Sequence, residues 1–328
     1  MTSPDLVAVV GAGRMGRALA AWVHEVGHSV LVWDRASDVG ARLAGSGVPA
    51  GVQVAASLVE VPGRARTIFL ALPAVAIEPV VRVLADHLEP DHRLVLVSKG
   101  VDASFRRGSE ILRAHSSVRR IAVLGGPLVA TEIAAGHPQA IVVASRFDAV
   151  LAELRRLLER PRTWLVGTHD VPGVEIAGAL RNVSAIAMGI SEALGLSEAS
   201  RALILTRGLL DAAEVGRTMG AQAETFYGLC GVGDLVARRE ARYSRNFRLG
   251  LRLGEGVPLE RALAELSGEP EGLVTCRAAV AYAERVHLPL VVARAVAAVI
   301  AGAPARGELD AILAAGFPTA PLLGGAPE

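Results

Sequence analysis

The sequence predicts an α/β protein in which a doubly wound, mainly parallel sheet is followed by an all-α carboxyl-terminal domain. Three observations support this fold class. A glycine-rich turn joins the first β-branched run to a helical pattern. Strand-like and helix-like segments then alternate, which implies crossover connections and a sheet covered on both faces. Beyond Val171 the chain continues as successive helical patterns with no convincing strand.

The strands are expected where short runs rich in Val, Ile and Leu end near glycine, proline or polar residues. In chain order these runs are 6–10, 29–33, 68–72, 94–97, 121–124 and 140–144. Helices are expected where apolar residues recur every three or four positions between the strands, at 14–26, 74–87 and 148–158. Gly27 ends the first of these helices.

The change of pattern near Val171 predicts a domain boundary there, with a first domain at 1–171 and a helical, substrate-binding domain at 172–328. A helix is expected at 173–194 because apolar residues form one stripe along it. The stripe contains Ile176, Leu180, Val183, Ala187, Ile190 and Leu194. A second stripe, Gly178, Asn182, Ala185 and Gly189, permits close approach of another helix or of a ligand, and helix packing is the commoner reason for such a stripe.

Composition excludes several function classes. The chain has 328 residues, 52% hydrophobic and 20% charged, with no uninterrupted apolar run of membrane-spanning length and no export leader at its start, so we expect a soluble, cytoplasmic protein. The net charge of +1 and 4% aromatic residues do not favour binding to nucleic acid or to an anionic membrane. Cys230 and Cys276 are expected to be buried thiols. Lys99 is the only lysine among 34 lysines and arginines.

Gly11, Gly13 and Gly16 form the pattern GxGxxG between a strand and a helix, which is typical of a Rossmann-type dinucleotide site. The glycines permit a tight turn, close approach of the backbone to a pyrophosphate, and close packing of helix on strand. Asp34 ends the second strand 18 residues after Gly16 and favours NAD, because its carboxylate can accept hydrogen bonds from ribose hydroxyls. Arg35 leaves NADP open, since a guanidinium can bind a 2′-phosphate.

Ordered matches along nearly the whole chain resemble the NAD(P)-dependent glycerol-3-phosphate dehydrogenases of bacteria. The matching segments are GAGRMGRALA from Gly11, SKG from Ser98, GGPLVATEIAAGHPQAI from Gly125, GVEIAGALRNVSAIAMGI from Gly173, TRGL from Thr206, GLCGVGDLV from Gly228, SRNFRLG from Ser244 and PEG from Pro270. The resemblance implies hydride transfer between a nicotinamide coenzyme and dihydroxyacetone phosphate or glycerol 3-phosphate.

The resemblance also implies site residues, and these expectations are grouped by role. The expected catalytic residues are Lys99, Arg181 and Asp234. The expected coenzyme-binding residues are Gly11, Gly13, Arg14, Met15, Gly16, Asp34, Arg35, Pro73, Lys99, Ala130, Arg245 and Glu271. The expected substrate-binding residues are Lys99, Gly126, Arg181, Asp234, Ser244, Arg245 and Asn246, which together would hold a small anionic substrate. Arg245 suits a phosphate dianion because its planar donors bind two oxygens at once.

The sequence departs from the family pattern at three positions. Arg181 stands where the family has the lysine that is regarded as its proton donor, and arginine stays charged. Leu128 replaces a small hydroxyl residue, and Thr131 replaces a lysine. Two explanations are open for position 181. Either the general bias of this chain toward arginine has replaced a lysine that the enzyme can do without, or the substrate differs and Arg181 binds a second anionic group. If a side chain still transfers the proton, Lys99 is the best candidate, because burial and neighbouring cations can lower the pKa of an amine.

Two alternatives therefore stay open beside the dehydrogenase hypothesis. One is a reductase of another small ketone that bears phosphonate, sulfonate or carboxylate, and the other is a non-catalytic nicotinamide-binding sensor. No metal site is expected, because His24 and His28 are separated by the helix-ending Gly27 and lack a third ligand nearby. A homodimer is expected, Arg238, Arg239 and Arg242 are assigned to a solvated loop, and the segment 317–328 is expected to be loosely ordered.

Overall fold

A computed structural model of the chain describes residues 5–45, 48–237, 244–266 and 268–317. The chain forms two compact units, one of residues 1–99 and 106–175 and one of residues 100–105 and 176–328. The sequence placed a boundary between 171 and 172, and a helix, α8, begins at Val171. The compact units divide within that helix, between Glu175 and Ile176, because an unbroken helix carries no local signal of where one unit ends.

The first unit contains an eight-stranded sheet among its described residues, in the order β3-β2-β1-β4-β5-β6-β7-β8. The strands are β1 Leu6–Val10, β2 Ser29–Trp33, β3 Gln53–Val54, β4 Thr67–Leu70, β5 Arg93–Leu96, β6 Arg120–Gly125, β7 Gln139–Ser145 and β8 Thr163–Thr168. The six strands expected from the sequence are all present. The two that were not expected, β3 and β8, are the outermost strands of the sheet.

The sheet is parallel from β3 to β6, and β7 runs antiparallel to β6 while β8 runs parallel to β7. The predicted mainly parallel, doubly wound arrangement is therefore confirmed. β1 and β4 are neighbours although the chain visits β2 and β3 between them, so the order of the strands reverses beside β1. In open α/β sheets, ligands bind outside the carboxyl ends of the strands at such a reversal.

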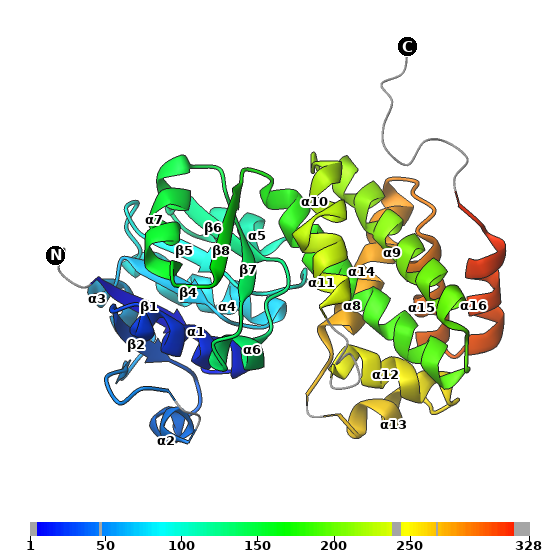
Figure 1. The fold of residues 1–328 in the computed structure, drawn as a ribbon, viewed down its shortest axis with the longest axis horizontal. Coiled ribbons are helices and arrows are strands. Elements are labelled where there is room, and N and C mark those ends of the chain that lie inside the picture. The colour runs from blue at the N-terminus through cyan, green and yellow to red at the C-terminus, as the bar shows by residue number, and fades with distance from the viewer. Residues whose placement is uncertain (1–4, 46–47, 238–243, 267, 318–328) are drawn as a thin grey trace, which may run out of the picture. The chain divides into compact units, whose positions relative to one another are not determined.

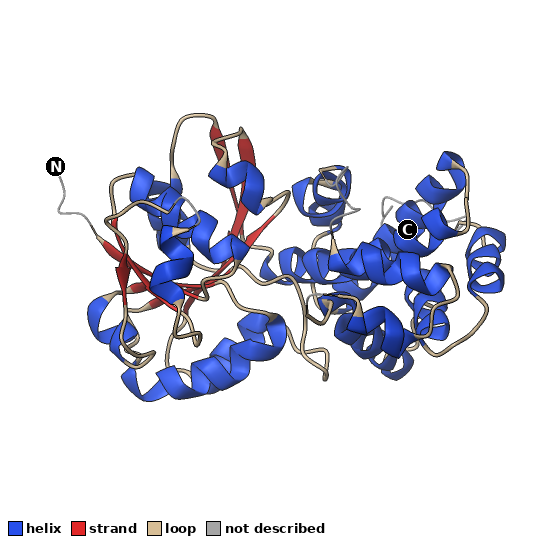
Figure 2. Cartoon of the chain, turned by 90° about the horizontal axis from the view of Figure 1, so that it is seen from below, coloured by secondary structure: helices blue, strands red, loops and turns tan. Residues whose placement is uncertain are grey.

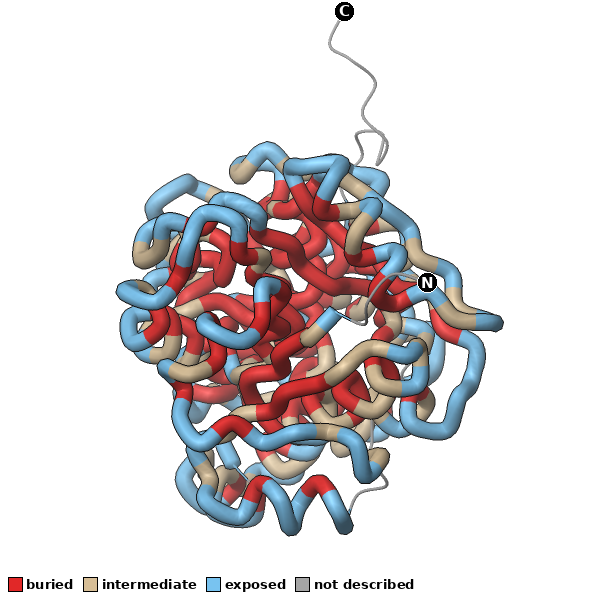
Figure 3. Tube along the Cα trace, turned by 90° about the vertical axis from the view of Figure 1, so that its left-hand side faces the viewer, coloured by how far each residue is buried: buried red, intermediate tan, exposed pale blue. Residues whose placement is uncertain are grey.

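Helices cover both faces of this sheet (Figures 1 and 2). They are α1 Arg14–Glu25, α2 Val39–Ala44, α3 Glu60–Arg64, η1 Ala74–Ala76, α4 Ile77–Leu84, η2 Ala85–His87, α5 Gly108–His115, α6 Ala130–Ala134 and α7 Asp148–Leu158. Helix α1 packs with α6 and α7, whereas α4 packs with α5. β1 and β4, which lie between these layers, are buried almost throughout, so their apolar runs reflect burial on both faces. Figure 3 shows that buried segments occupy the interior of the chain and that exposed segments surround them.

The regular elements of the described part of the second unit are helices, and the first of them, α8, begins in the first unit, which extends to Glu175. Its helices are α8 Val171–Ala193, α9 Glu198–Thr218, α10 Ala223–Tyr227, the π-helical turn η3 Leu229–Gly233, α11 Asp234–Val236, α12 Arg245–Gly254, α13 Leu259–Ala264, α14 Glu271–Arg285, α15 Val291–Ile300 and α16 Ala305–Ala314. Among the described residues, no helix has both the length and the apolar character that crossing a membrane demands. Cys230 and Cys276 are buried free thiols, as the sequence predicted.

The small-residue stripe on α8 serves helix packing at Gly189. A Cβ atom added there would lie 2.0 Å from the carbonyl oxygen of Phe247 in α12, and one added at Gly250 would lie 2.0 Å from the carbonyl oxygen of Ile186 in α8. The two helices therefore approach so closely that only glycine fits at these positions, which confirms the packing interpretation there. Asn182, assigned to the same stripe, has a different role that is described below.

Candidate active site

The three glycines of the turn between β1 and α1 differ in whether the surrounding atoms leave room for a side chain. Gly11 has φ +104°, and a Cβ there would lie 2.5 Å from the carbonyl oxygen of Ala71. At Gly16 a Cβ would lie 1.8 Å from the carbonyl oxygen of Gly11. At Gly13 a Cβ would meet nothing within 4 Å. Gly11 and Gly16 are thus required by the protein's own packing, whereas Gly13 leaves space open beside the turn.

The amino terminus of α1 suits an anion. Gly13 is its N-cap and supplies no side-chain cap, and the first turn holds no acidic residue. Gly13 and Arg14 are exposed and Met15 is half-buried, so the first N–H groups of the helix adjoin the open space. These N–H groups and the helix dipole favour negative charge, as a dinucleotide's pyrophosphate requires. The residues present therefore fit a dinucleotide.

Asp34 follows β2 and binds the glycine turn directly. Its Oδ2 accepts a hydrogen bond of 2.6 Å from the backbone N–H of Ala12, and its Oδ1 accepts one of 3.0 Å from that of Ala36. These bonds fix the carboxylate beside the turn, and each oxygen retains a further lone pair for a ribose hydroxyl. Arg35 is exposed.

Further predicted residues follow the next strands at the same edge of the sheet. Pro73 lies after β4, Lys99 lies after β5, and Ala130 begins α6 after β6. Lys99 Nζ donates a hydrogen bond of 2.9 Å to the carbonyl oxygen of Gly126, whose φ is +85°. This bond uses one of the three donors of the ammonium and orients the amine.

The second unit holds a buried polar cluster centred on Arg181 of α8. Its Nε lies 2.8 Å from Oδ2 of Asp234, and the side chains of the two residues are 6% and 1% exposed. Its Nη2 donates to Oδ1 of Asn182 at 3.1 Å. Because a buried ion pair that loses one partner leaves an uncompensated charge, removing either member typically costs about 3–5 kcal/mol of stability.

Asn182 links this pair to α12 and α14. Its Oδ1 also accepts a hydrogen bond of 3.0 Å from Nδ2 of Asn246, and Asn246 Oδ1 accepts one of 3.0 Å from the backbone N–H of Gly272. A Cβ on Gly272 would lie 2.7 Å from Asn246 Oδ1, so a larger residue there would displace that amide. Side chains and backbone from four segments thus form one connected network, Asp234–Arg181–Asn182–Asn246–Gly272.

The other predicted residues of this unit lie at helix starts beside the network. Ser244 is the N-cap of α12 and Arg245 is its first residue, directly before Asn246. Arg245 Nη1 donates to the carbonyl oxygen of Glu269 at 3.2 Å. Glu271 is the first residue of α14, next to Gly272. Arg238, Arg239 and Arg242 lie outside the described residues, as does the segment 318–328.

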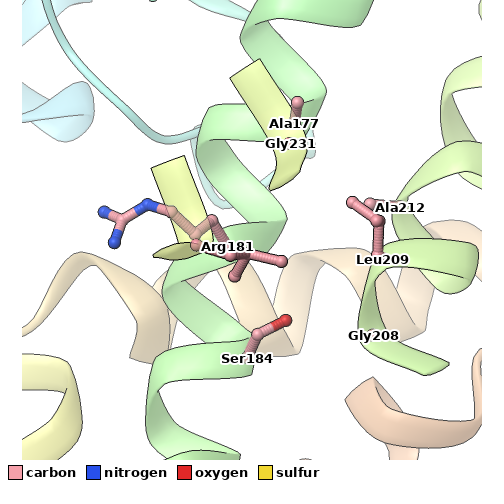
Figure 4. Close-up of a pocket in the computed structure, with 8 residues that line it drawn as sticks. Ala177, Arg181, Ser184, Gly208, Leu209, Ala212 and Gly231 are labelled. Atoms are coloured by element: carbon pink, nitrogen blue, oxygen red, sulfur yellow. The ribbon is translucent and has the colours of Figure 1, made fainter. Parts of the chain in front are cut away.

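A small cavity lies against Arg181 but is not a substrate pocket. It has room for about one water molecule and is lined mainly by small and apolar residues of α8, α9 and the segment after α10. Figure 4 shows the guanidinium of Arg181 directed away from Leu209 and Ala212, so only the aliphatic part of this side chain faces the cavity. The charged end lies toward Asp234 instead.

The sequence did not single out Asn182 as a site residue, although it accepts hydrogen bonds from two predicted ones. The signal was present, because an amide stands in a helix segment that is otherwise apolar or small except for Arg181. Leu128, where the family pattern has a hydroxyl, is 2% exposed and packs in the apolar core of the first unit. Among the described residues, Glu89, Asp91 and His92 gather as a possible metal cluster.

The ring nitrogens of His92 are already engaged. Its Nδ1 accepts a hydrogen bond of 2.9 Å from the N–H of Glu89, and its Nε2 lies 2.9 Å from the carbonyl oxygen of Pro62. Arg66 forms ion pairs with Glu89 and Asp91. These contacts account for the cluster as a structured turn, and it supplies no argument for a metal.

Comparison with protein families gives two consecutive matches. Residues 6–150 match the model described as NAD-dependent glycerol-3-phosphate dehydrogenase N-terminus. Residues 170–307 match the model described as NAD-dependent glycerol-3-phosphate dehydrogenase C-terminus. The two matches lie in the order in which the sequence motifs occur.

Known proteins extend these matches over nearly the whole chain. A glycerol-3-phosphate dehydrogenase [NAD(P)+] of Rhodospirillum rubrum is 36% identical over 310 residues, which cover 91% of this chain and 88% of the relative. The crystal structure of glycerol-3-phosphate dehydrogenase from Coxiella burnetii is 28% identical, with a TM-score of 0.87 over 94% of this chain and 99% of that one. The yeast enzyme, 23% identical with a TM-score of 0.81 over 94% and 99% of the two chains, shows the shared fold.

Proposed function

The chain belongs to the NAD-dependent glycerol-3-phosphate dehydrogenase family, and on that premise we propose that it interconverts dihydroxyacetone phosphate and sn-glycerol 3-phosphate with an arginine in place of the family's lysine. The protein is an oxidoreductase that acts on a CH–OH group and uses a nicotinamide coenzyme. The observation that carries the proposal is the buried network in which Arg181 is bound to Asp234 and Asn182.

The first unit binds the coenzyme in this proposal. The N–H groups at the start of α1 receive the pyrophosphate, and Gly13 leaves room for it. NAD is the preferred coenzyme, because the fixed carboxylate of Asp34 accepts ribose hydroxyls and repels the 2′-phosphate of NADP. When bound, the nicotinamide supplies or accepts the hydride.

The second unit binds the substrate in this proposal. The Nε and Nη2 groups of Arg181 are held by Asp234 and Asn182, and an arginine has five N–H donors. The outer Nη1 end therefore serves as a fixed cation for the substrate oxygen that becomes negatively charged as the carbonyl is reduced. Arg245 binds the phosphate, with Ser244 and Asn246 beside it as neutral donors.

Lys99 transfers the proton in this proposal. Arginine does not lose its proton at any pH at which a protein is folded, so Arg181 stabilises charge without acting as an acid or a base. The Lys99 ammonium, oriented by the Gly126 carbonyl, donates to the carbonyl oxygen in reduction and recovers the proton in oxidation.

A second candidate function is reduction of another small anionic ketone. Leu128 places a buried apolar side chain where the family pattern has a hydroxyl, and Arg181 adds planar donors that suit a carboxylate or sulfonate. In this candidate the hydroxyl donor is absent because Leu128 packs in the core, and the planar donors of Arg181 bind the anionic group. A cytoplasmic location and a homodimeric state are further proposals that family membership makes reasonable.

The test is a steady-state assay of the purified chain with NADH and NADPH against a panel of small ketones bearing phosphate, phosphonate, sulfonate or carboxylate. We expect dihydroxyacetone phosphate to have the highest kcat/KM, with NADH preferred over NADPH. A higher kcat/KM for a carboxylate or sulfonate ketone would instead support the second candidate. Binding of either coenzyme without turnover of any ketone would contradict both and favour a sensor.

A further inference from the structure

Glu175, in the first turns of α8, is a buried carboxylate that the proposed mechanism does not use. Its side chain is 5% exposed. Oε1 accepts a hydrogen bond of 2.8 Å from the backbone N–H of Ser109, and Oε2 accepts one of 2.6 Å from the Ser109 hydroxyl. Arg107 Nη1 lies 3.4 Å from Oε2. The carboxylate is thus held by three donors.

These donors all come from the amino terminus of α5. Arg107 is the N-cap of that helix, and Ser109 is its second residue. Glu175 therefore satisfies one of the N–H groups that a helix start leaves unpaired, and its charge opposes the positive end of the helix dipole. Burial raises the pKa of Glu175, against the lowering effect of Arg107 and Ser109, so these contacts offset part of the cost of keeping a charge there.

The position of Glu175 on α8 relates it to the polar cluster. Asn182 lies seven residues later, which at about 100° per residue returns it to within about 20° of the same helix face, two turns farther on. Arg181 is the preceding residue. Because Glu175, Arg181 and Asn182 lie on one unbroken helix, a rotation of α8 about its axis at Glu175 would carry Arg181 and Asn182 with it.

We propose that Glu175 is a positioning residue: by binding the start of α5, it fixes the rotation of α8 and so sets the orientation of Arg181 and Asn182 for catalysis. The predicted effect on turnover rests on the proposed function, whereas the predicted effect on the structure of α8 can be measured even in an inactive protein. A misplacement of about 1 Å at reacting groups can cost about a hundredfold in rate, so a small rotation suffices.

The test compares three variants of the full chain. Glu175→Gln keeps the size of the side chain but replaces one of two oxygens that both accept hydrogen bonds with an amide donor, so one of the present bonds is lost in either orientation. Ser109→Ala removes only the hydroxyl donor and is the milder change. Glu110→Gln is the matched control, because Glu110 binds both the side chain and the backbone N–H of the same Arg107, whereas among the described residues no hydrogen bond or ion pair joins Glu110 to Glu175, on which only its charge acts.

We expect Glu175→Gln to lower kcat about tenfold and Ser109→Ala to lower it about threefold, because positioning errors act on the transition state. The NADH dissociation constant is expected to change less than about twofold, since the glycine turn is untouched. It can be measured by energy transfer from tryptophan, because Trp22, Trp33 and Trp164 all lie in the first unit. Glu110→Gln is expected to retain wild-type kcat.

Hydrogen exchange separates this inference from the proposed function. Amides of residues 178–186 are expected to exchange faster in Glu175→Gln than in the wild type or in Glu110→Gln. If the wild type reduced no ketone, the proposed function would fail, yet unchanged exchange in this segment would still overturn the positioning role. In an active enzyme, unaltered kcat in both Glu175→Gln and Ser109→Ala, or a loss of NADH affinity that accounts for the whole effect, would overturn it too.

Discussion

The glycine turn of the first unit is made by backbone conformation over a few consecutive residues, whereas the polar cluster of the second unit is made by side chains from distant segments. In the turn, Gly11 and Gly16 are required because any Cβ would strike backbone atoms nearby. In the cluster, Arg181 and Asn246 stand 65 positions apart in the chain and meet only through Asn182.

The two regions therefore tolerate amino-acid substitutions in different ways. A backbone turn admits almost no substitution at its packed glycines, but its conformation depends little on which side chains surround it. A side-chain network can exchange one member for another while its partners keep their places, as long as every buried polar group stays paired. A lysine-to-arginine exchange in the second unit is therefore compatible with an unchanged coenzyme site in the first.

Lys99 gives the largest expected effect and tests whether catalysis can be separated from coenzyme binding within the first unit. Lys99→Met keeps the length of the side chain and removes the amine. Loss of a general acid typically lowers kcat by about two to four orders of magnitude, so we expect a fall of about a thousandfold. NADH affinity, measured by tryptophan energy transfer, is expected to stay within about threefold of the wild type.

Lys99→Arg is the companion variant, because it restores a cation that cannot release its proton. If the role of Lys99 is proton transfer, this variant stays nearly as inactive as Lys99→Met. Recovery of most of the activity by arginine would reduce Lys99 to an electrostatic role, and full activity in Lys99→Met would remove it from the mechanism.

Asp211 extends the comparison to stability, because this residue of the second unit binds the start of a helix that lies far away in the sequence. Asp211 of α9 accepts hydrogen bonds from the N–H groups of Val291, Val292 and Ala293, which begin α15, and pairs with Arg207 at 3.6 Å. Burial nevertheless raises the pKa of Asp211 from 3.8 to about 6.

A raised carboxyl pKa means that the folded state binds more protons than the unfolded state between pH 3.8 and about 6. The stabilisation is complete below pH 3.8 and is lost as the pH rises through about 6, by about 3 kcal/mol in all. Asp211→Asn lacks this titration. We therefore expect the difference in free energy of unfolding between Asp211→Asn and the wild type, followed by circular dichroism in urea, to shift by about 2.5 kcal/mol in favour of the variant between pH 4 and pH 7. A constant difference would show that Asp211 titrates normally.

The sequence predicted the fold of the first unit well where local patterns decide it. The limits of β2 and α7 agree with the structure because a short apolar run and a regular amphipathic repeat mark them. β3 has two residues, too few for any pattern. β8 is an edge strand with exposed Trp164 and Val166, so it lacks the continuous apolar run of its buried neighbours.

Other features depend on tertiary contacts that no local pattern records. The antiparallel pairing of β6 with β7 depends on the path that the chain takes between the two strands, which the residues of the strands themselves do not reveal. Gly11, Gly16, Asp34 and Lys99 were predicted as site residues because a motif or a resemblance marks them, and their contacts lie within the first unit. Asn182 was not predicted as a site residue, because an asparagine among small residues on a helix cannot be told from a packing residue until its hydrogen-bond partners are known.

Two matched glycine substitutions test whether the turn really has two kinds of glycine. Gly16→Ala places a Cβ against the Gly11 carbonyl, so we expect a lower melting temperature and a loss of NADH affinity together. Gly13→Ala meets nothing within 4 Å and should fold normally, yet its methyl group would occupy space that a pyrophosphate needs. We expect an NADH dissociation constant raised about thirtyfold with an unchanged melting temperature, since close backbone approach is lost. Normal affinity in Gly13→Ala would remove the pyrophosphate from this turn.

Arg181→Lys gives the smallest expected effect and tests the predicted exchange of the family's lysine for arginine at this position. A lysine ammonium is a single point of charge and lacks the planar edge that binds Asp234 and Asn182 at once, so one partner loses its bond. We expect kcat/KM for dihydroxyacetone phosphate to fall about tenfold, about the cost of one hydrogen bond to a charged group. Because a lysine that keeps the ion pair with Asp234 gives up the bond to Asn182, Asn182→Ala in the same background should cost less than it does in the wild type. A rise in activity would mean instead that the site is a family site in which the arginine replaced a useful lysine, and Lys99 would then share proton transfer with position 181.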